Sequence, residues 1–247
     1  MREIARSSKQ AVVFCLCVAL SLTSLTVFSG FSKSISRILL TDAKKLLAAD
    51  IIIHSHEKLS DKLDGDISAL VRQGKIERCR YWEFYSMVRR LDDRASVLAH
   101  LKVVEKGYPF YGKIVLKSGR PFQDVLTRGQ AVVEQSLLDR LGVGIGDSLK
   151  VGYTTLTIRD VVVSEPDRPA EVFSFGPRIF VSGKDLEALN LIKTGSRITY
   201  VSLIKVIDKG QIDAVAANLR QLANPDRERV DTYLTARTRV KQVGQVE

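Results

Sequence analysis

An uncharged apolar run from Gln10 to Ser32 constrains this chain more than any other feature of the sequence. Inside it the only ionisable side chains are the thiols of Cys15 and Cys17. A helix needs about 20 apolar residues to cross the core of a bilayer, so the run is long enough to do so. No second run of this kind occurs in the 247 residues. The sequence therefore predicts one membrane-spanning helix attached to one large polar region.

The charges before the run predict its orientation. Arg2, Arg6 and Lys9 precede it, and the positive-inside rule then places the N-terminus in the cytoplasm and the remainder outside. A cleaved signal peptide is the alternative, with 27–29 as the candidate cleavage site. A retained helix is favoured because the apolar region is long for a signal peptide and lacks a clean A-x-A site.

Composition excludes several classes of protein. The formal net charge is +10 and the pI about 9.6, but Lys and Arg are scattered and form no long basic block. This pattern argues against a nucleic-acid-binding protein and favours proximity to anionic lipid headgroups. Only Cys79 lies outside the apolar run, so a disulfide framework is excluded.

The polar region predicts an α+β fold. Apolar residues at helical spacing over 34–49 predict a stalk helix that ends at Asp50, followed by a strand at 51–53. A helix over 60–74, two strands over 77–90 and 95–104, and a turn-rich region of short strands follow. A strand over 200–207, a helical stripe over 212–219 and a strand over 230–233 resemble the second half of the first lobe.

These elements predict a split βαβ unit with a β-rich insertion between its halves. The expected parts of the chain are the N-terminus and transmembrane helix (1–32), the helical stalk (33–49), the first half of the split unit (50–106), the inserted β-rich subdomain (107–198), the second half (199–235) and a polar tail (236–247).

No catalytic, cofactor-binding or metal-binding residue is predicted. The glycine-rich segment 142–147 has the wrong spacing for a dinucleotide fingerprint and indicates a helix end followed by a turn. His54 and His56 share a face if both lie on one strand, but no cysteine or carboxylate cluster is clearly paired with them. They are therefore interpreted as polar residues at a strand end rather than metal ligands.

One loop is a candidate contact surface. Two prolines and a Gly-Pro pair fix the backbone around it, and Phe residues interrupt an otherwise polar stretch. Its basic side chains are expected to pair with its acidic ones. A structured crossover whose Phe residues close the lobe is the equally weighted alternative. The candidate contact residues are Glu165, Asp167, Arg168, Phe173, Phe175 and Arg178.

The order and spacing of several short segments resemble ABC transporter permeases of the MacB/FtsX type, in particular the YbbP-like permeases related to lipoprotein-releasing ones. The matching segments run over nearly the whole chain, and they are 46–51, 107–110, 141–142, 146–149, 165–168, 176–178 and 195–197. The resemblance implies a porter-like subdomain with a β-rich insertion, on the periplasmic side of the bacterial inner membrane, without enzymatic activity.

The resemblance also implies partners. A separate cytoplasmic ATPase drives such permeases, further membrane helices follow the domain, and a dimer is left open. The chain stops before those helices, which predicts a truncated reading frame, one piece of a split gene or a bounded fragment. The alternatives are a stand-alone membrane-anchored binding or scaffold module and, with least support, a secreted hydrolase.

Overall fold

The computed structural model describes residues 48–166, 176–193 and 195–232, together with Val18, Thr23 and Thr235. The chain divides into two compact units, Met1–Ala43 and Lys44–Glu247. Among the described residues, no helix is long and apolar enough to cross a membrane. The predicted transmembrane helix, most of the predicted stalk and the polar tail lie outside the described residues, although Val18 and Thr23 are helical.

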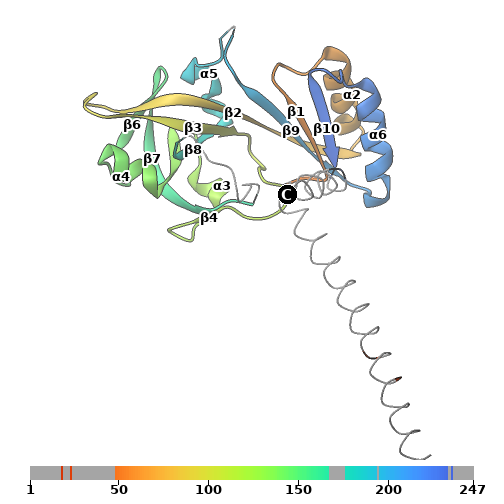
Figure 1. Cartoon of the computed structure of the whole chain (residues 1–247), viewed down its shortest axis with the longest axis horizontal. Coiled ribbons are helices and arrows are strands. Elements are labelled where there is room, and N and C mark those ends of the chain that lie inside the picture. The colour runs from red at the N-terminus through yellow and green to blue at the C-terminus, as the bar shows by residue number, and fades with distance from the viewer. Residues whose placement is uncertain are drawn as a thin grey trace, which may run out of the picture. The chain divides into compact units, whose positions relative to one another are not determined.

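The second unit is a mixed α+β structure built on one large sheet, as predicted (Figure 1). Its ten strands are β1 (Ile51–Ser55), β2 (Ile76–Arg90), β3 (Ser96–Val104), β4 (Val115–Leu116), β5 (Gln130–Glu134), β6 (Ser148–Val151), β7 (Thr154–Ser164), β8 (Arg178–Ser182), β9 (Thr199–Val206) and β10 (Glu228–Thr232). The described helices are α2 (Asp61–Arg72), α3 (Phe122–Val125), α4 (Gln135–Leu141), α5 (Leu186–Leu189) and α6 (Ile212–Leu222), with 3₁₀ turns η1 (Gly183–Asp185) and η2 (Lys209–Gln211).

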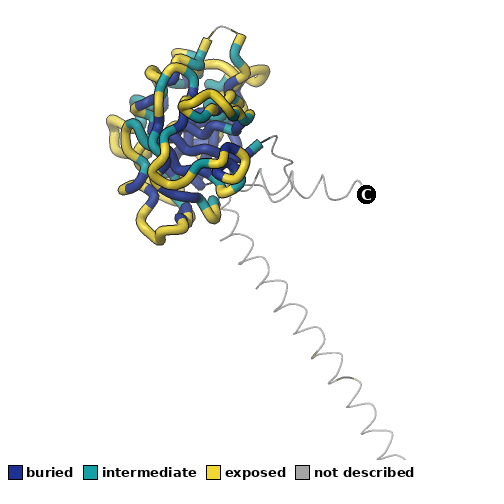
Figure 2. Tube along the Cα trace, turned by 90° about the vertical axis from the view of Figure 1, so that its left-hand side faces the viewer, coloured by how far each residue is buried: buried dark blue, intermediate teal, exposed yellow. Residues whose placement is uncertain are grey.

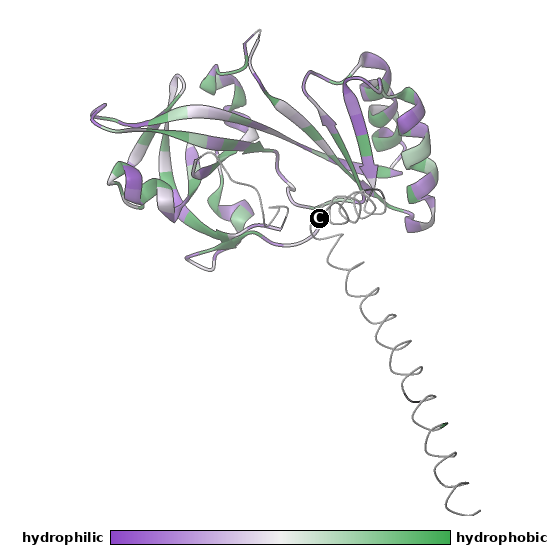
Figure 3. Cartoon of the chain, in the orientation of Figure 1, coloured by the Kyte–Doolittle hydropathy of each residue, from purple (hydrophilic) through white to green (hydrophobic). Residues whose placement is uncertain are grey.

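At one end of the sheet, four antiparallel strands lie in the order β10–β1–β9–β2. Strand β9 separates β1 from β2, and β1 separates β9 from β10, so two β–α–β segments interleave. Helices α2 and α6 lie side by side on one face (Figure 1). Both are amphipathic, with purple and green residues in Figure 3. Their apolar sides bury Leu63 and Ile67 of α2 and Val215 and Leu219 of α6 against the sheet.

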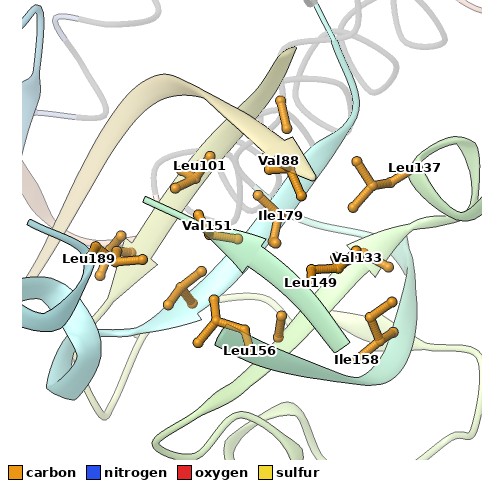
Figure 4. Packing of buried hydrophobic residues seen from close by; sticks show 14 of the residues in the cluster. Val88, Leu101, Val133, Leu137, Leu149, Val151, Leu156, Ile158, Ile179 and Leu189 are labelled. Carbon is orange, nitrogen blue, oxygen red and sulfur yellow. The ribbon is translucent and has the colours of Figure 1, made fainter. Parts of the chain in front are cut away.

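At the other end, six strands close on themselves. Strand β2 pairs with β3, β3 with β8, β8 with β5, β5 with β7, β7 with β6, and β6 again with β2. Their inward-facing side chains form an apolar core, shown in Figure 4, to which α4 and α5 contribute Leu137 and Leu189. The sheet runs through both ends because the 15-residue strand β2 belongs to each of them.

Local signals in the sequence set several boundaries. Gly142 ends α4 in the left-handed conformation, as its position after Leu141 predicts. Ser182 accepts a hydrogen bond from the amide of Lys184 and caps η1 as expected. Ser60 precedes α2, but its hydroxyl is bonded to Glu228 rather than to the helix. The predicted stalk helix does not extend to Ala48, whose φ is +56°.

Glycine is required at the turn between β6 and β7. Gly152 has φ +57°, and a Cβ there would collide with the carbonyl oxygen of Leu189. The next residue, Tyr153, donates its amide to the same oxygen at 3.1 Å. The close approach of the two backbones fixes the end of α5 against this turn.

Candidate functional site

The predicted contact loop is described only at its two ends. Glu165 and Arg178 form an ion pair, as expected, and both side chains are largely buried. Arg178 also donates from Nη2 to Nδ1 of His100 at 3.1 Å, and its amide donates to Glu134. The other predicted contact residues, Asp167, Arg168, Phe173 and Phe175, lie outside the described residues. The contact role of the loop stays a prediction.

His100 is partly buried. Its ring stacks on Tyr85 with centroids 4.7 Å apart. The Arg178 hydrogen bond makes Nδ1 an acceptor, which places the imidazole proton on Nε2. His100 therefore contacts the described end of the loop through Arg178.

The chain enters the sheet through a polar cluster around one buried carboxylate, which sequence reasoning missed. Asp50 is 0% exposed, and its Oδ2 accepts from the amide of Val206 at 2.9 Å, from the hydroxyl of Tyr111 at 2.8 Å and from Nζ of Lys209 at 2.6 Å. Lys209 also donates to the carbonyl of Val206 at 2.8 Å. We call Asp50, Tyr111 and Lys209 the entry anchor.

Backbone hydrogen bonds reinforce the entry anchor. The amides of Phe110 and Tyr111 donate to the carbonyl of Ala48 at 3.0 and 3.1 Å, and the amide of Asp50 donates to Ile204 at 3.0 Å. Residues 48–50 are thus held from two sides, by the segment around Tyr111 and by β9. The only local signal in the sequence is a lone carboxylate that opens an apolar strand.

The pKa values of Tyr111 and Lys209 reflect both desolvation and the hydrogen bonds of the entry anchor. Burial raises the pKa of Tyr111 above its ordinary value, and the hydrogen bond from Lys209 partly opposes this effect. Burial alone would lower the pKa of Lys209, but its hydrogen bonds to Asp50 and Tyr111 outweigh it, so the pKa rises. Lys209 therefore remains an ammonium group, and the cluster holds a charge-assisted set of hydrogen bonds.

The chain enters and leaves the described sheet at neighbouring positions. Ile51, the first residue of β1, is paired with Thr232, the last residue of β10, in antiparallel register. The segment before β1 and the segment after β10 therefore extend from the same edge. Figure 2 shows the buried strands of this sheet in dark blue behind exposed loops.

A groove lies near the opposite end of β1 and β9, where Ser55 is paired with Tyr200, and Tyr200 itself lines it. It has a volume of about 700 Å³. Its floor is formed by Arg78, Arg80 and Ser202, and Trp82 lines it next to the floor. One wall is the start of α2 and the other is α5 with the segment after it. We call it the inter-core groove, because the apolar core under α2 and α6 ends on one side of it and the core of the closed strands begins on the other.

The cations on the floor already have partners. Arg78 donates from Nη2 to Asp64 at 2.7 Å and to the hydroxyl of Ser202 at 3.3 Å, while its buried Nε has no hydrogen-bond partner among the described residues. Arg80 donates twice to Glu105 and lies 5.7 Å from the ring centroid of Trp82. The floor is thus polar and largely neutralised.

Two titratable residues of the sheet are held neutral by burial. Burial, followed by the nearby Arg229 guanidinium, lowers the pKa of His54 to about 4. Burial and the Glu105 carboxylate raise the pKa of Cys79 to about 12. His56 lies beyond the end of β1 and is exposed. Among the described residues, no group of three or more His, Cys, Asp or Glu side chains could hold a metal ion.

Comparisons with known proteins agree with this architecture. The family model of the MacB-like periplasmic core domain matches residues 11–222. An uncharacterised ABC transporter permease, YbbP of Escherichia coli strain K12, is 31% identical over 103 residues, which are 42% of this chain. The match spans 12% of that protein's length.

The solved structure of a MacB periplasmic region shares the fold, and a second solved structure is similar to this chain. The periplasmic region of MacB from Actinobacillus actinomycetemcomitans has a TM-score of 0.54 at 14% identity, over 82% of this chain and 97% of that one. The extracellular domain of the noncanonic ABC-type transporter YknZ from Gram-positive bacteria has a TM-score of 0.49 at 13% identity, over 74% and 100%.

The family match covers most of the chain and includes every strand of the sheet except β10. The family is the periplasmic, non-catalytic component of inner-membrane permeases, so the chain is not an enzyme. The chain therefore belongs to the family of MacB-like periplasmic core domains of ABC transporter permeases.

Proposed function

We propose that this chain couples a cytoplasmic ATPase to substrate handling on the periplasmic side of an inner-membrane permease. In this proposal, residues 10–32 span the membrane with the N-terminus in the cytoplasm, and the sheet lies in the periplasm. The partners are the ATPase and the membrane helices of the permease. The porter-like halves, 50–106 and 199–235, move as the part next to the membrane, and 107–198 is inserted between them.

The observation that carries the proposal is the entry anchor. A flexible linker before β1 would absorb any movement of the preceding segment. Here three backbone hydrogen bonds and the buried carboxylate of Asp50 tie residues 48–50 to β9 and to the segment at Tyr111. A displacement of Ala48 must therefore displace β9 or break this network, which costs about 1–3 kcal/mol for each buried polar group left unpaired.

The pairing of Ile51 with Thr232 supports the same role. The segment before β1 and the segment after β10 adjoin two strands that are paired with each other. A relative movement of these segments would therefore act directly on the β1–β10 pair. This arrangement suits a domain that responds to membrane segments before and after it.

Hydrogen exchange tests the anchor on the full chain. In Asp50→Ala, the Val206 amide loses its acceptor, and we expect it to exchange at least about tenfold faster, which corresponds to about 1.4 kcal/mol. Asp213→Asn is the matched control, because Asp213 lies in the exposed first turn of α6. Unchanged exchange at Val206 in Asp50→Ala would show that the anchor does not hold the entry.

A topology reporter tests the location. Alkaline phosphatase fused after Glu247 should be active in cells, because it requires an oxidising compartment outside the cytoplasm. An inactive phosphatase fusion, together with a fluorescent cytoplasmic reporter at the same position, would contradict the proposed orientation.

A further inference from the structure

We infer that the inter-core groove binds an extended peptide segment that combines an apolar side chain with a basic one. The inference goes beyond the coupling role and does not depend on it. The groove volume of about 700 Å³ falls within the about 300–1,000 Å³ that is typical of ligand sites. It opens at the end of β1 and β9 that is remote from Ile51 and Thr232, where the chain enters and leaves the sheet.

The apolar part of the lining defines one half of the ligand. Trp82 is only 9% exposed and borders the groove, and Leu59, Leu186 and Ile192 line its walls. An aromatic residue beside the floor, flanked by aliphatic walls, is a suitable receptor for one leucine-sized or aromatic side chain. A ligand without such a side chain would leave this surface hydrated.

The unpaired charges define the other half. Asp64 and Glu105 neutralise the two floor arginines. By contrast, within the described part of the chain, the side chains of Asp61 on the α2 wall and Glu187 on the α5 wall have no hydrogen bond or ion pair, and Lys58 is the only unpaired cation that lines the groove. The net charge of these three side chains is negative, so a cationic ligand complements the walls better than an anionic one.

Polar groups on the floor and wall favour a peptide over a hydrocarbon chain. The side-chain amide of Asn190 both donates and accepts, as a peptide backbone requires, and the hydroxyl of Ser202 lies on the floor. An acyl chain would cover the guanidinium groups of Arg78 and Arg80 without offering an acceptor, which carries a desolvation cost.

The chain carries its own reporter for this site, because Trp82 is its only tryptophan. The experiment uses the full chain in amphipol and a blocked pentapeptide of alternating lysine and leucine. We expect a saturable shift of Trp82 emission to shorter wavelength as the ring loses its remaining water. The matched probe, with glutamate in place of lysine, should bind at least about tenfold more weakly.

Variants locate the site. Removing both wall carboxylates, in Asp61→Asn with Glu187→Gln, should weaken binding of the lysine peptide by about five- to tenfold, while Asp213→Asn should leave it unchanged. Added salt should weaken binding to the wild-type chain. This salt dependence tests the charge complementarity even if the double variant does not fold.

Each other outcome overturns the inference. If neither peptide binds, the groove is not a peptide site. If both peptides bind equally well, the wall carboxylates do not select a basic ligand over an acidic one. Binding that the double variant leaves unchanged places the peptide elsewhere. A saturable Trp82 response to monomeric lysophosphatidylcholine, without one to the lysine peptide, assigns the groove to an amphiphilic lipid instead.

Discussion

The two faces of the sheet differ where β2 and β9 cross from one end of the structure to the other. On one face, Cys79 and Tyr81 of β2 and Val201 and Leu203 of β9 belong to a single apolar cluster that extends from β1 to β5. We call this the continuous face. On the opposite face, the interrupted face, the neighbouring positions are Arg78, Arg80 and Ser202, which form the floor of the inter-core groove.

The difference shows how one pair of strands serves two purposes. Successive residues of a strand point to opposite faces, so a single sequence can bury one side and leave the other polar. The continuous face joins the two ends of the sheet through packing, and even Lys102 is enclosed there, 4.4 and 4.7 Å from the ring centroids of Tyr81 and Tyr108. The interrupted face can hold a ligand because little apolar packing depends on it.

Adjacent residues of β9 give the sharpest test of this comparison. Leu203→Ala removes a fully buried side chain from the continuous face and should lower the free energy of unfolding by about 3 kcal/mol. Ser202→Ala removes one hydrogen bond to Arg78 on the interrupted face and should cost less than about 1 kcal/mol. Urea denaturation of the full chain, followed by Trp82 emission, measures both. Equal losses would show that the groove floor is part of the stabilising core.

Acidification tests the continuous face at β1. His54 shares that face with Ile52, and its pKa is lowered from 6.5 to about 4 in the folded chain. Between these values the unfolded chain binds a proton that the folded chain does not, so stability falls as pH falls. The slope approaches about 1.4 kcal/mol per pH unit for this residue.

His56 provides the control for this titration. His54→Asn should remove that component of the pH dependence, while His56→Asn, at an exposed position, should retain it. The difference in unfolding free energy between wild type and His54→Asn, measured at pH 7 and pH 5, isolates the residue. A difference that is constant with pH would show that His54 is hydrated in the fold.

Much of the fold could be predicted from local patterns. The strands predicted over 77–90 and 95–104, joined at Asp92 and Asp93, correspond to the β2–β3 hairpin, and the helical stripe over 212–219 predicts α6. The closed arrangement of six strands could not be predicted, because the pairing of Val88 with Val151 depends on the register of strands far apart in the chain.

The candidate sites were harder to predict for the same reason. Tyr111 and Lys209 lie 61 and 159 residues from Asp50, and no local pattern links them. Likewise, Arg78 looks like an ordinary outward-facing strand residue until α2 and α5 form walls on either side of it. Only the Glu165–Arg178 ion pair followed from the composition of one short segment.

The smallest expected effect tests how the α2 wall of the groove is built. Gly65 lies inside α2, and an added Cβ would meet no atom within 4 Å. Alanine at this position should therefore stabilise the chain by about 0.5–1 kcal/mol, because it reduces the backbone entropy that folding must overcome. The gain should appear as a higher urea midpoint with an unchanged slope. A loss of stability would mean that α2 packs more closely at Gly65 than the structure indicates. The α2 wall of the inter-core groove would then be less open, and the two faces of the sheet would differ less.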